Sequence, residues 1–214
     1  MLSASLSRPA LSVAVVILAA GKSSRMGFPK PLLQWNGRSF LDHVLDKYSR
    51  IGLPVWVVLG EHNEQVRSEV DLAKVHVVVN LHPELGQLSS LQIGLRQVRE
   101  SSGRQFSGVV FHPVDHPAVQ LSTVRTLVET HFLYPQCLLL PRHAGRRGHP
   151  ALFPEKLYAE LAAAPLDQGA RWVVRRHPEL IRDVEVPDPA VLLNVDTPEE
   201  YRRLVDGMSS LGEP

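Results

Sequence analysis

The sequence VAVVILAAGKSSRMG, residues 13–27, joins a continuous apolar run to a glycine loop. An uninterrupted run of β-branched residues is typical of a strand covered on both faces of a parallel sheet. The small residues that follow let a phosphate approach successive backbone N–H groups closely. Lys22, Arg25 and Lys30 supply cations that would offset phosphate charge. The pattern predicts a phosphate-binding loop after a central strand, with a solvated basic turn as the alternative.

Strand-like and helix-like segments alternate along the chain beyond this loop. Further strands are predicted at 54–59, 75–79, 107–111, 136–140, 150–153 and 191–195, and helices at 39–48, 63–71, 88–99, 123–132, 154–163, 169–177 and from Thr197 onward. This alternation predicts an α/β fold with a doubly wound, mostly parallel sheet in a single domain. We expect that domain to span residues 12–207, with flexible termini at 1–11 and 208–214. The basic, glycine-bearing segment 142–147 is predicted as a loop.

Composition narrows the possible partners. The 214 residues carry 23 Lys and Arg against 22 Asp and Glu, so no basic field suggests a nucleic-acid partner. No apolar stretch is long enough to predict a membrane span. The single Cys137 cannot form an internal disulfide; we expect it to be a small buried hydrophobe in a strand of a cytoplasmic protein. The run 11–20 after Arg8 could also be a signal peptide, but cleavage there would separate the strand from its loop.

The glycine loop resembles a known signature. Residues 18–27, with Lys30-Pro31-Leu32-Leu33 after them, are similar to the L-A-A-G-x-S-x-R-M-G-x-x-K motif of nucleotidyltransferases with a GT-A-like Rossmann fold. The resemblance is strongest to the molybdenum cofactor cytidylyltransferase and guanylyltransferase group, and it covers roughly residues 13–204. It implies that the loop backbone at Leu18, Ala19, Ala20 and Gly21 binds nucleotide phosphates. It also implies catalytic roles for Arg25 and Lys30, which would stabilise the charge that shifts as pyrophosphate leaves.

Two carboxylates are candidate metal ligands. Asp115 lies where a predicted parallel strand ends, which is the edge where α/β sheets bind ligands. Asp196 precedes the helix start Thr197-Pro198-Glu199-Glu200, in which Thr197 is the expected N-cap. From the residues alone, Asp115 could equally cap a turn and Asp196 could complement the helix dipole. The resemblance implies that both bind Mg²⁺, because related chains carry metal-binding carboxylates in matching D-x-P and N-x-D-T-P-E elements.

Two further segments resemble substrate-binding elements of the same group. Gly86, Ser89 and Ser90 match a G-x-x-S-S-L element that contacts the nucleobase and ribose of CTP; ordinary helix capping by either serine is the alternative. Arg147 and His149 match an R-G-H-P element for the acceptor, and could otherwise belong to a solvated loop. The resemblance thus implies a small acceptor-binding subregion in the second half of the chain.

These features predict a Mg²⁺-dependent nucleotidyltransferase that transfers CMP from CTP to molybdopterin or molybdenum cofactor and releases pyrophosphate. The alternatives are GTP or another nucleoside triphosphate, or a sugar-1-phosphate or other phosphorylated metabolite as acceptor. A different class of protein, a non-catalytic nucleotide-binding module that delivers cofactor to a molybdoenzyme partner, also remains open. The other histidines show no metal-ligand spacing, so we expect no zinc.

Overall fold

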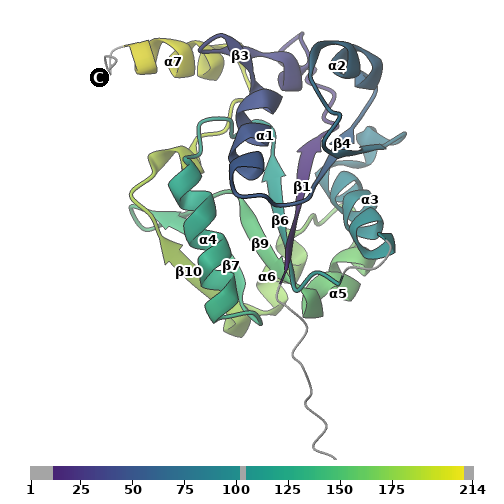
Figure 1. The fold of residues 1–214 in the computed structure, drawn as a ribbon, viewed down its shortest axis with the longest axis vertical. Coiled ribbons are helices and arrows are strands. Elements are labelled where there is room, and N and C mark those ends of the chain that lie inside the picture. The colour runs from purple at the N-terminus through teal and green to yellow at the C-terminus, as the bar shows by residue number, and fades with distance from the viewer. Residues whose placement is uncertain (1–11, 102–104, 210–214) are drawn as a thin grey trace, which may run out of the picture.

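An eight-stranded sheet with β1 (Val13–Ala19) near its middle organises the molecule, which a computed structural model describes over residues 12–101 and 105–209 (Figure 1). The spatial order is β10-β7-β9-β6-β1-β4-β5, with β8 paired to β7. The other strands are β4 (Val55–Leu59), β5 (His76–Val79), β6 (Gly108–Pro113), β7 (Leu138–His143), β8 (Arg146–Arg147), β9 (Ala151–Pro154) and β10 (Ile181–Glu185). Within this sheet, as far as the structure describes it, β8 and β9 run antiparallel to their neighbours and the other pairs are parallel. A separate hairpin joins β2 (Gln34–Trp35) to β3 (Arg38–Ser39).

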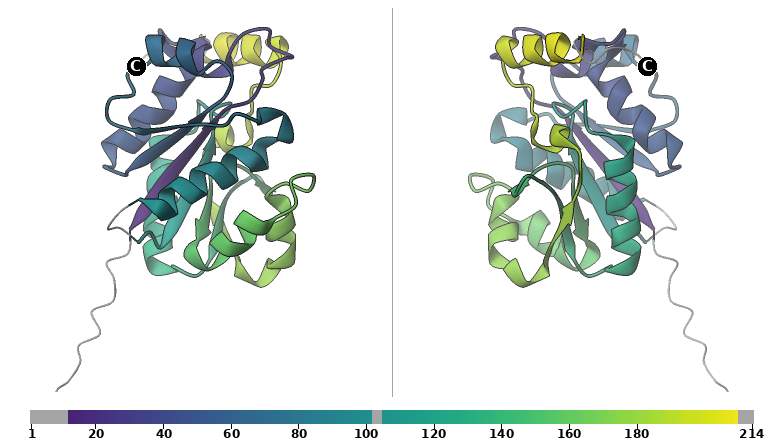
Figure 2. Two further views of the ribbon diagram at one scale, coloured as in Figure 1. Left: turned by 90° about the vertical axis from the view of Figure 1, so that its right-hand side faces the viewer. Right: turned by 90° about the vertical axis from the view of Figure 1, so that its left-hand side faces the viewer.

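Helices cover both faces of the sheet (Figure 2). The α-helices are α1 (Phe40–Arg50), α2 (Asn63–Glu69), α3 (Gln87–Glu100), α4 (Leu121–Leu133), α5 (Tyr158–Ala163), α6 (Arg171–Arg176) and α7 (Pro198–Ser209). Short 3-10 turns lie at Lys30–Leu32, Pro83–Leu85, Glu155–Leu157, Pro178–Leu180 and Pro189–Leu192. Buried residues of α1 and α4 form one core cluster, and those of α3, α5 and α6 form the other.

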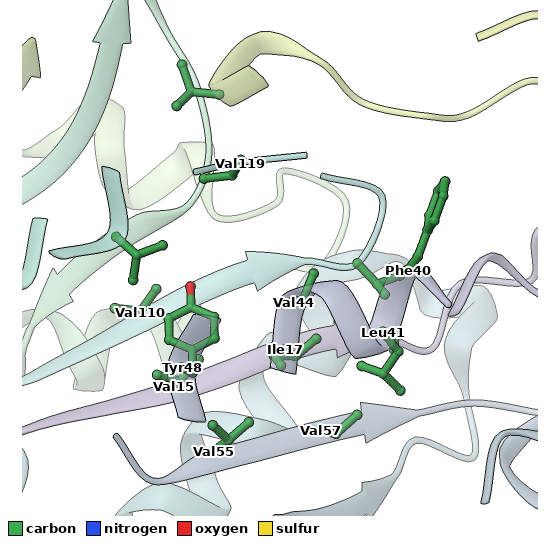
Figure 3. Close-up of a cluster of buried hydrophobic side chains, with 14 of the residues drawn as sticks. Val15, Ile17, Phe40, Leu41, Val44, Tyr48, Val55, Val57, Val110 and Val119 are labelled. Atoms are coloured by element: carbon green, nitrogen blue, oxygen red, sulfur yellow. The ribbon is translucent and has the colours of Figure 1, made fainter. Parts of the chain in front are cut away.

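Alternate residues of β1 enter these two clusters, because successive side chains of a strand point to opposite faces. Val15 and Ile17 lie beneath the apolar side of α1, which includes Val44 and Tyr48 (Figure 3). The buried Tyr48 hydroxyl is 2.7 Å from Nδ1 of His112 on β6, so this face also contains a satisfied polar contact. Burial on both sides explains why β1 is apolar throughout.

The second face depends on close packing of α3. Gly94 lies against β1 and β4, and a Cβ at this position would stand 2.4 Å from Cγ1 of Val16 and 3.0 Å from Cγ2 of Val58. Neither side chain has room to move, since both lie fully buried in the same cluster. The missing side chain at Gly94 therefore sets how near α3 approaches the sheet, and with it the position of the helix start beside the candidate site.

The structure confirms the α/β fold with a doubly wound, mostly parallel sheet and corrects several local predictions. The strand predicted at 191–195 is wrong: the chain forms a 3-10 turn at Pro189–Leu192, capped by the buried Asp188, whose Oδ1 accepts from Ala190 N–H at 3.0 Å. The loop predicted at 142–147 is instead the end of β7, a tight turn and β8. Cys137 is half-buried and precedes β7 rather than lying in it.

Two paired elements were absent from the sequence prediction: the hairpin of β2 and β3, and the edge strand β10. The terminus 1–11 lies outside the described residues, as does 210–214 beyond α7.

At the start of α7, Thr197 Oγ1 accepts from the Glu200 N–H at 3.2 Å while Glu200 Oε2 accepts from the Thr197 N–H at 2.9 Å, so the expected N-cap is confirmed. Among the helices described, none has the length and apolar character needed to cross a bilayer.

Gly94→Ala tests the close approach of α3. Alanine normally stabilises a helix relative to glycine, but here overpacking against Val16 and Val58 should lower the free energy of unfolding by about 1–3 kcal/mol. Gly207→Ala in α7 is the matched control, because a Cβ there meets nothing within 4 Å; it should leave stability unchanged or slightly raised. Urea unfolding measures both, and a Gly94→Ala protein as stable as the control would contradict the packing.

Candidate active site

The candidate site lies where the sheet changes its winding direction. β1 and β6 are adjacent and parallel, but the chain leaves β1 through α1 toward β4 and leaves β6 through α4 toward β7. In doubly wound sheets, the crevice between two such diverging connections is where ligands bind. The glycine loop follows β1 here, and Asp115 follows β6. Topology alone therefore brings these two sequence-predicted features together.

The loop after β1 is held by its own backbone. The carbonyl oxygen of Ser23 accepts from the N–H groups of Met26 and Gly27 at 2.9 and 3.1 Å, and the Ser23 hydroxyl accepts from Lys30 N–H at 3.0 Å. Both turn residues, Ser23 and Gly27, have positive φ, at 52° and 66°. On the sheet side, a Cβ at Gly60 would stand 2.4 Å from the carbonyl oxygen of Ala20, so glycine is required for the end of β4 to pass the loop.

Lys30 joins the two candidate metal ligands. Its Nζ donates to Asp115 Oδ2 at 3.3 Å and to Asp196 Oδ1, while Arg25 lies 4.0 Å from Asp196 Oδ2. A backbone hydrogen bond from Val195 N–H to the Asp115 carbonyl, 2.9 Å long, fixes the two segments side by side. Residues 30, 115 and 196, far apart in sequence, thus meet at one point.

The charges at this point are mutually stabilised. Partial burial alone would raise the pKa of the Asp196 carboxyl, but the hydrogen bond and charge of Lys30, together with Arg25 and Asn194, hold that pKa below its ordinary value. Asn194 contributes a 2.8 Å hydrogen bond from Nδ2 to Asp196 Oδ2. Asp196 is therefore a carboxylate at neutral pH.

The donor set fits a divalent metal ion. Asp115 Oδ1 is buried and has no hydrogen-bond partner in the described part of the chain. Two carboxylates with one uncommitted oxygen supply the hard oxygen ligands that Mg²⁺ and Mn²⁺ prefer. The described residues contain no group of three His, Cys, Asp or Glu side chains that could hold a metal. An ion here would need further ligands from phosphate oxygens and water, which is how Mg²⁺ is commonly bound beside phosphates.

Two clefts meet at these carboxylates. The first encloses about 280 Å³, and the second about 710 Å³. Both are lined by Asp115 and Asp196, together with Leu18, Gln87 and Pro113. A ligand in either cleft would therefore reach the same pair of carboxylates, an arrangement suited to bringing two reactants together.

Most of the sequence-predicted site residues line one of these clefts. The first cleft is lined by Leu18, Ala19, Ala20, Gly21, Arg25, Lys30, Gly86, Ser90, Asp115 and Asp196. The second is lined by Arg147 and His149. Ser89 lines neither; its hydroxyl donates to the carbonyl of Gly86 at 2.8 Å.

The second cleft combines arginines with neutral imidazoles. Arg147 makes two hydrogen bonds to the Asp183 carboxylate, 2.6 Å from Nε and 3.1 Å from a terminal nitrogen. Burial lowers the pKa of His149 to about 4, and repulsion by His116 when it is protonated, and by Arg171, acts in the same direction. The ring of His116 lies 4.9 Å from that of His149.

The structure adds two residues that the sequence analysis does not identify as part of the site. His116 is buried, with Nε2 3.8 Å from Asp115 Oδ1. Its place directly after a predicted ligand at a strand end is a signal that could have found it. Asn80 is buried at the end of β5 and holds the start of α3. It directly follows the apolar run Val77-Val78-Val79 at the end of β5, and Asp115 likewise lies just beyond the end of its strand, β6.

Curated relatives of this chain include enzymes with different names. A probable molybdenum cofactor guanylyltransferase of Rhodopirellula baltica is 29% identical over 204 residues, covering 93% of this chain and 90% of the relative. A nicotine blue oxidoreductase of Paenarthrobacter nicotinovorans is 29% identical, covering 89% and 95%. A molybdenum cofactor cytidylyltransferase of Escherichia coli is 26% identical, covering 87% and 92%. The relatives therefore bear both guanylyl- and cytidylyltransferase names.

A solved structure resembles this chain in both fold and sequence. The crystal structure of Rv0371c from Mycobacterium tuberculosis, described as a complex with manganese, superimposes with a TM-score of 0.76 at 30% identity, covering 91% of this chain and 98% of that one. The family model of the MobA-like NTP transferase domain matches residues 15–181, which include the glycine loop, Lys30 and Asp115. This chain thus belongs to the family of MobA-like NTP transferase domains.

Proposed function

We propose that the protein transfers a nucleotidyl group from a nucleoside triphosphate to a phosphorylated molybdopterin-type acceptor and releases pyrophosphate. The observation that carries this proposal is the position of Asp115 and Asp196, with Lys30 between them, on the shared wall of two clefts. A group-transfer enzyme needs its two substrates to meet at one charged centre. The names of the molybdenum cofactor relatives support the acceptor class.

The triphosphate belongs in the first cleft. Residues 20–25 of the glycine loop line it, and so does Lys30. As the bond from the α-phosphorus to the leaving pyrophosphate breaks, negative charge increases on the departing oxygens, and these two cations stabilise it. Lys30 is held in place before the substrate arrives by its contacts with Asp115 and Asp196.

Asp115 and Asp196 would hold the divalent metal ion, which we propose to be Mg²⁺. When bound, the ion would supply charge neutralisation on the phosphate oxygens. The second cleft would hold the acceptor, whose phosphate attacks the α-phosphorus. Because that phosphate is already an anion, no protein residue has to remove a proton from it. Arg147, already oriented by Asp183, would align the acceptor.

CTP is the nucleotide that we propose. The segment 86–91 resembles the G-x-x-S-S-L element of cytidylyltransferase-like enzymes. Gly86, Gln87 and Ser90 of this segment line the first cleft, beside the loop that would hold the triphosphate. GTP is the competing possibility, since relatives with guanylyltransferase names match this chain as well.

Nucleotide preference is tested by measuring pyrophosphate release with molybdopterin as acceptor and each of CTP, GTP, ATP and UTP in turn, with Mg²⁺. We expect kcat/KM for CTP to exceed that for GTP at least tenfold, about 1.4 kcal/mol of discrimination. If the enzyme prefers GTP, the proposed nucleotide is wrong but the proposed reaction stands. No pyrophosphate release with any of the four, while a sugar-1-phosphate acceptor is turned over, would overturn the proposed acceptor.

Asp115→Asn and Asp196→Asn test the shared carboxylates. Each change removes one negative charge that holds Lys30 and the metal ion, so kcat for pyrophosphate release should fall roughly 10²- to 10³-fold. The Mg²⁺ concentration needed for half-maximal rate should rise in both variants. Asp206→Asn, an exposed position on α7, is the control and should match the wild type. Unchanged rates in either active-site variant would contradict the proposed centre.

Arg147→Ala tests the assignment of the second cleft. Loss of this side chain should raise KM for the acceptor by roughly tenfold, because a charged hydrogen bond contributes about 1.5–3 kcal/mol. KM for the nucleoside triphosphate should stay within twofold of the wild type, since Arg147 does not line the first cleft. Arg203→Ala, which removes an exposed ion pair on α7, serves as the control. An equal rise in both KM values would show that the two clefts are not separate.

A further inference from the structure

Asn80 has a buried side-chain amide that hydrogen-bonds to residues beside the proposed nucleotide cleft. Only 1% of the residue is exposed. Its Oδ1 accepts from the backbone N–H of His82 at 2.9 Å. Because a backbone N–H can only donate, this contact fixes which side of the amide is oxygen, and the NH₂ group must face the other way. There Nδ2 donates to the hydroxyls of both Ser89 and Ser90, each at 2.9 Å.

The Ser89 hydroxyl is fully used within the protein. It accepts from Asn80 and donates to the carbonyl of Gly86 at 2.8 Å. The same carbonyl also accepts from the Ser89 N–H at 3.2 Å. Ser89, which the sequence identifies as a nucleotide contact, is therefore a residue that closes the first turn of α3.

The Ser90 hydroxyl differs in one respect. It accepts from Asn80, but in the described part of the chain no acceptor takes its own proton. The Gly86 carbonyl, which a helical serine at this position would ordinarily reach, is already occupied by Ser89. Ser90 lines the first cleft although only 4% of it is exposed. A ligand in that cleft could therefore supply the acceptor that this proton lacks.

We propose that Asn80 is a positioning residue: by donating to Ser90, it makes that hydroxyl a hydrogen-bond donor toward the bound nucleotide. Ser90 then recognises an acceptor atom of the nucleoside half, either on the base or on the ribose. This inference rests on the proposed function, since it takes the first cleft to be the nucleotide site. A serine hydroxyl has one proton and two lone pairs; when a buried amide occupies one lone pair and no protein acceptor takes the proton, the proton is available to donate to a ligand.

The triphosphate half is not the target of this contact. Ser90 lies in the first turn of α3. The basic residues that would hold phosphates come instead from the loop after β1 and the turn beyond it; they are Lys22, Arg25 and Lys30. Gly86, Gln87 and Pro83 lie beside Ser90 in the cleft lining and carry no charge. An uncharged donor among uncharged neighbours suits a neutral acceptor such as a ring carbonyl, a ring nitrogen or a ribose oxygen.

Asn80→Asp provides a direct test because it reverses the direction of the hydrogen bonds at nearly constant size. The new carboxylate can still accept from His82 N–H, but it can no longer donate, so Ser89 and Ser90 must donate to it. The Ser90 proton then turns away from the cleft. Titration calorimetry with CTP and with GTP should show that Asn80→Asp and Ser90→Ala each weaken nucleotide binding roughly five- to tenfold, the loss of about one hydrogen bond.

The double variant and a second probe separate positioning from general damage. Asn80→Asp combined with Ser90→Ala should bind no more weakly than either single variant, because both remove the same donor. Inorganic tripolyphosphate, which lacks a nucleoside, should bind all three variants as it binds the wild type. Ser89→Ala is the matched control and should keep nucleotide affinity within twofold, since its hydroxyl does not line the cleft.

Several outcomes would overturn the inference. They are wild-type nucleotide affinity in Ser90→Ala, additive losses in the double variant, or a matching loss of tripolyphosphate binding in Asn80→Asp. If circular dichroism shows that Asn80→Asp does not fold, Asn80→Ala replaces it; Ser90→Ala must then cost less in that background than in the wild type. If the wild type binds neither CTP nor GTP, the proposed function fails with the inference; if it binds one of them and Ser90→Ala has no effect, only the inference fails.

Discussion

The contact of the Lys30 ammonium with Asp115 and Asp196 is the interaction on which the site depends. Two carboxylates that contact the same ammonium would repel each other without that cation between them. Lys30 offsets this repulsion. It also links the segment after the glycine loop to Asp115, which follows β6, and to Asp196, which precedes α7. Its charge would also act on the leaving pyrophosphate. One side chain thus connects the charge balance of the site to the chemistry proposed for it.

The sheet explains why this contact can form. β1 and β6 lie side by side and end at the same edge, so the loop and Asp115 emerge next to each other. The chain comes to this edge again after β10, where the turn at Pro189–Leu192 and the hydrogen bond from Val195 to Asp115 bring Asp196 into place. The buried contacts at Gly60 and Gly94 hold the loop and α3 against the sheet without intervening side chains. Two clefts follow on either side of the carboxylates.

The sequence predicted the central strands because burial on both faces leaves an unbroken apolar run, as in β1. It missed β10, in which buried Val184 is flanked by the charged residues Asp183 and Glu185, as an edge strand permits. It was wrong at 191–195, where Val191 and Val195 are buried in the core without pairing to a strand. It indicated the meeting of Lys30, Asp115 and Asp196 through a family resemblance, not through spacing. The sequence shows only that Asn80 follows an apolar strand run; its role depends on which atoms it pairs with, which a residue pattern does not contain.

We propose that a metal ion bound by Asp115 and Asp196 joins the two clefts into one reaction centre. A crystal structure of the protein with Mn²⁺ and a non-hydrolysable CTP analogue tests it most directly, because manganese can be located by its anomalous scattering. We expect an anomalous peak in contact with oxygens of both carboxylates and of the nucleotide phosphates, with the triphosphate along the loop after β1. Manganese bound elsewhere, or a nucleotide bound with neither carboxylate near its phosphates, would contradict the account.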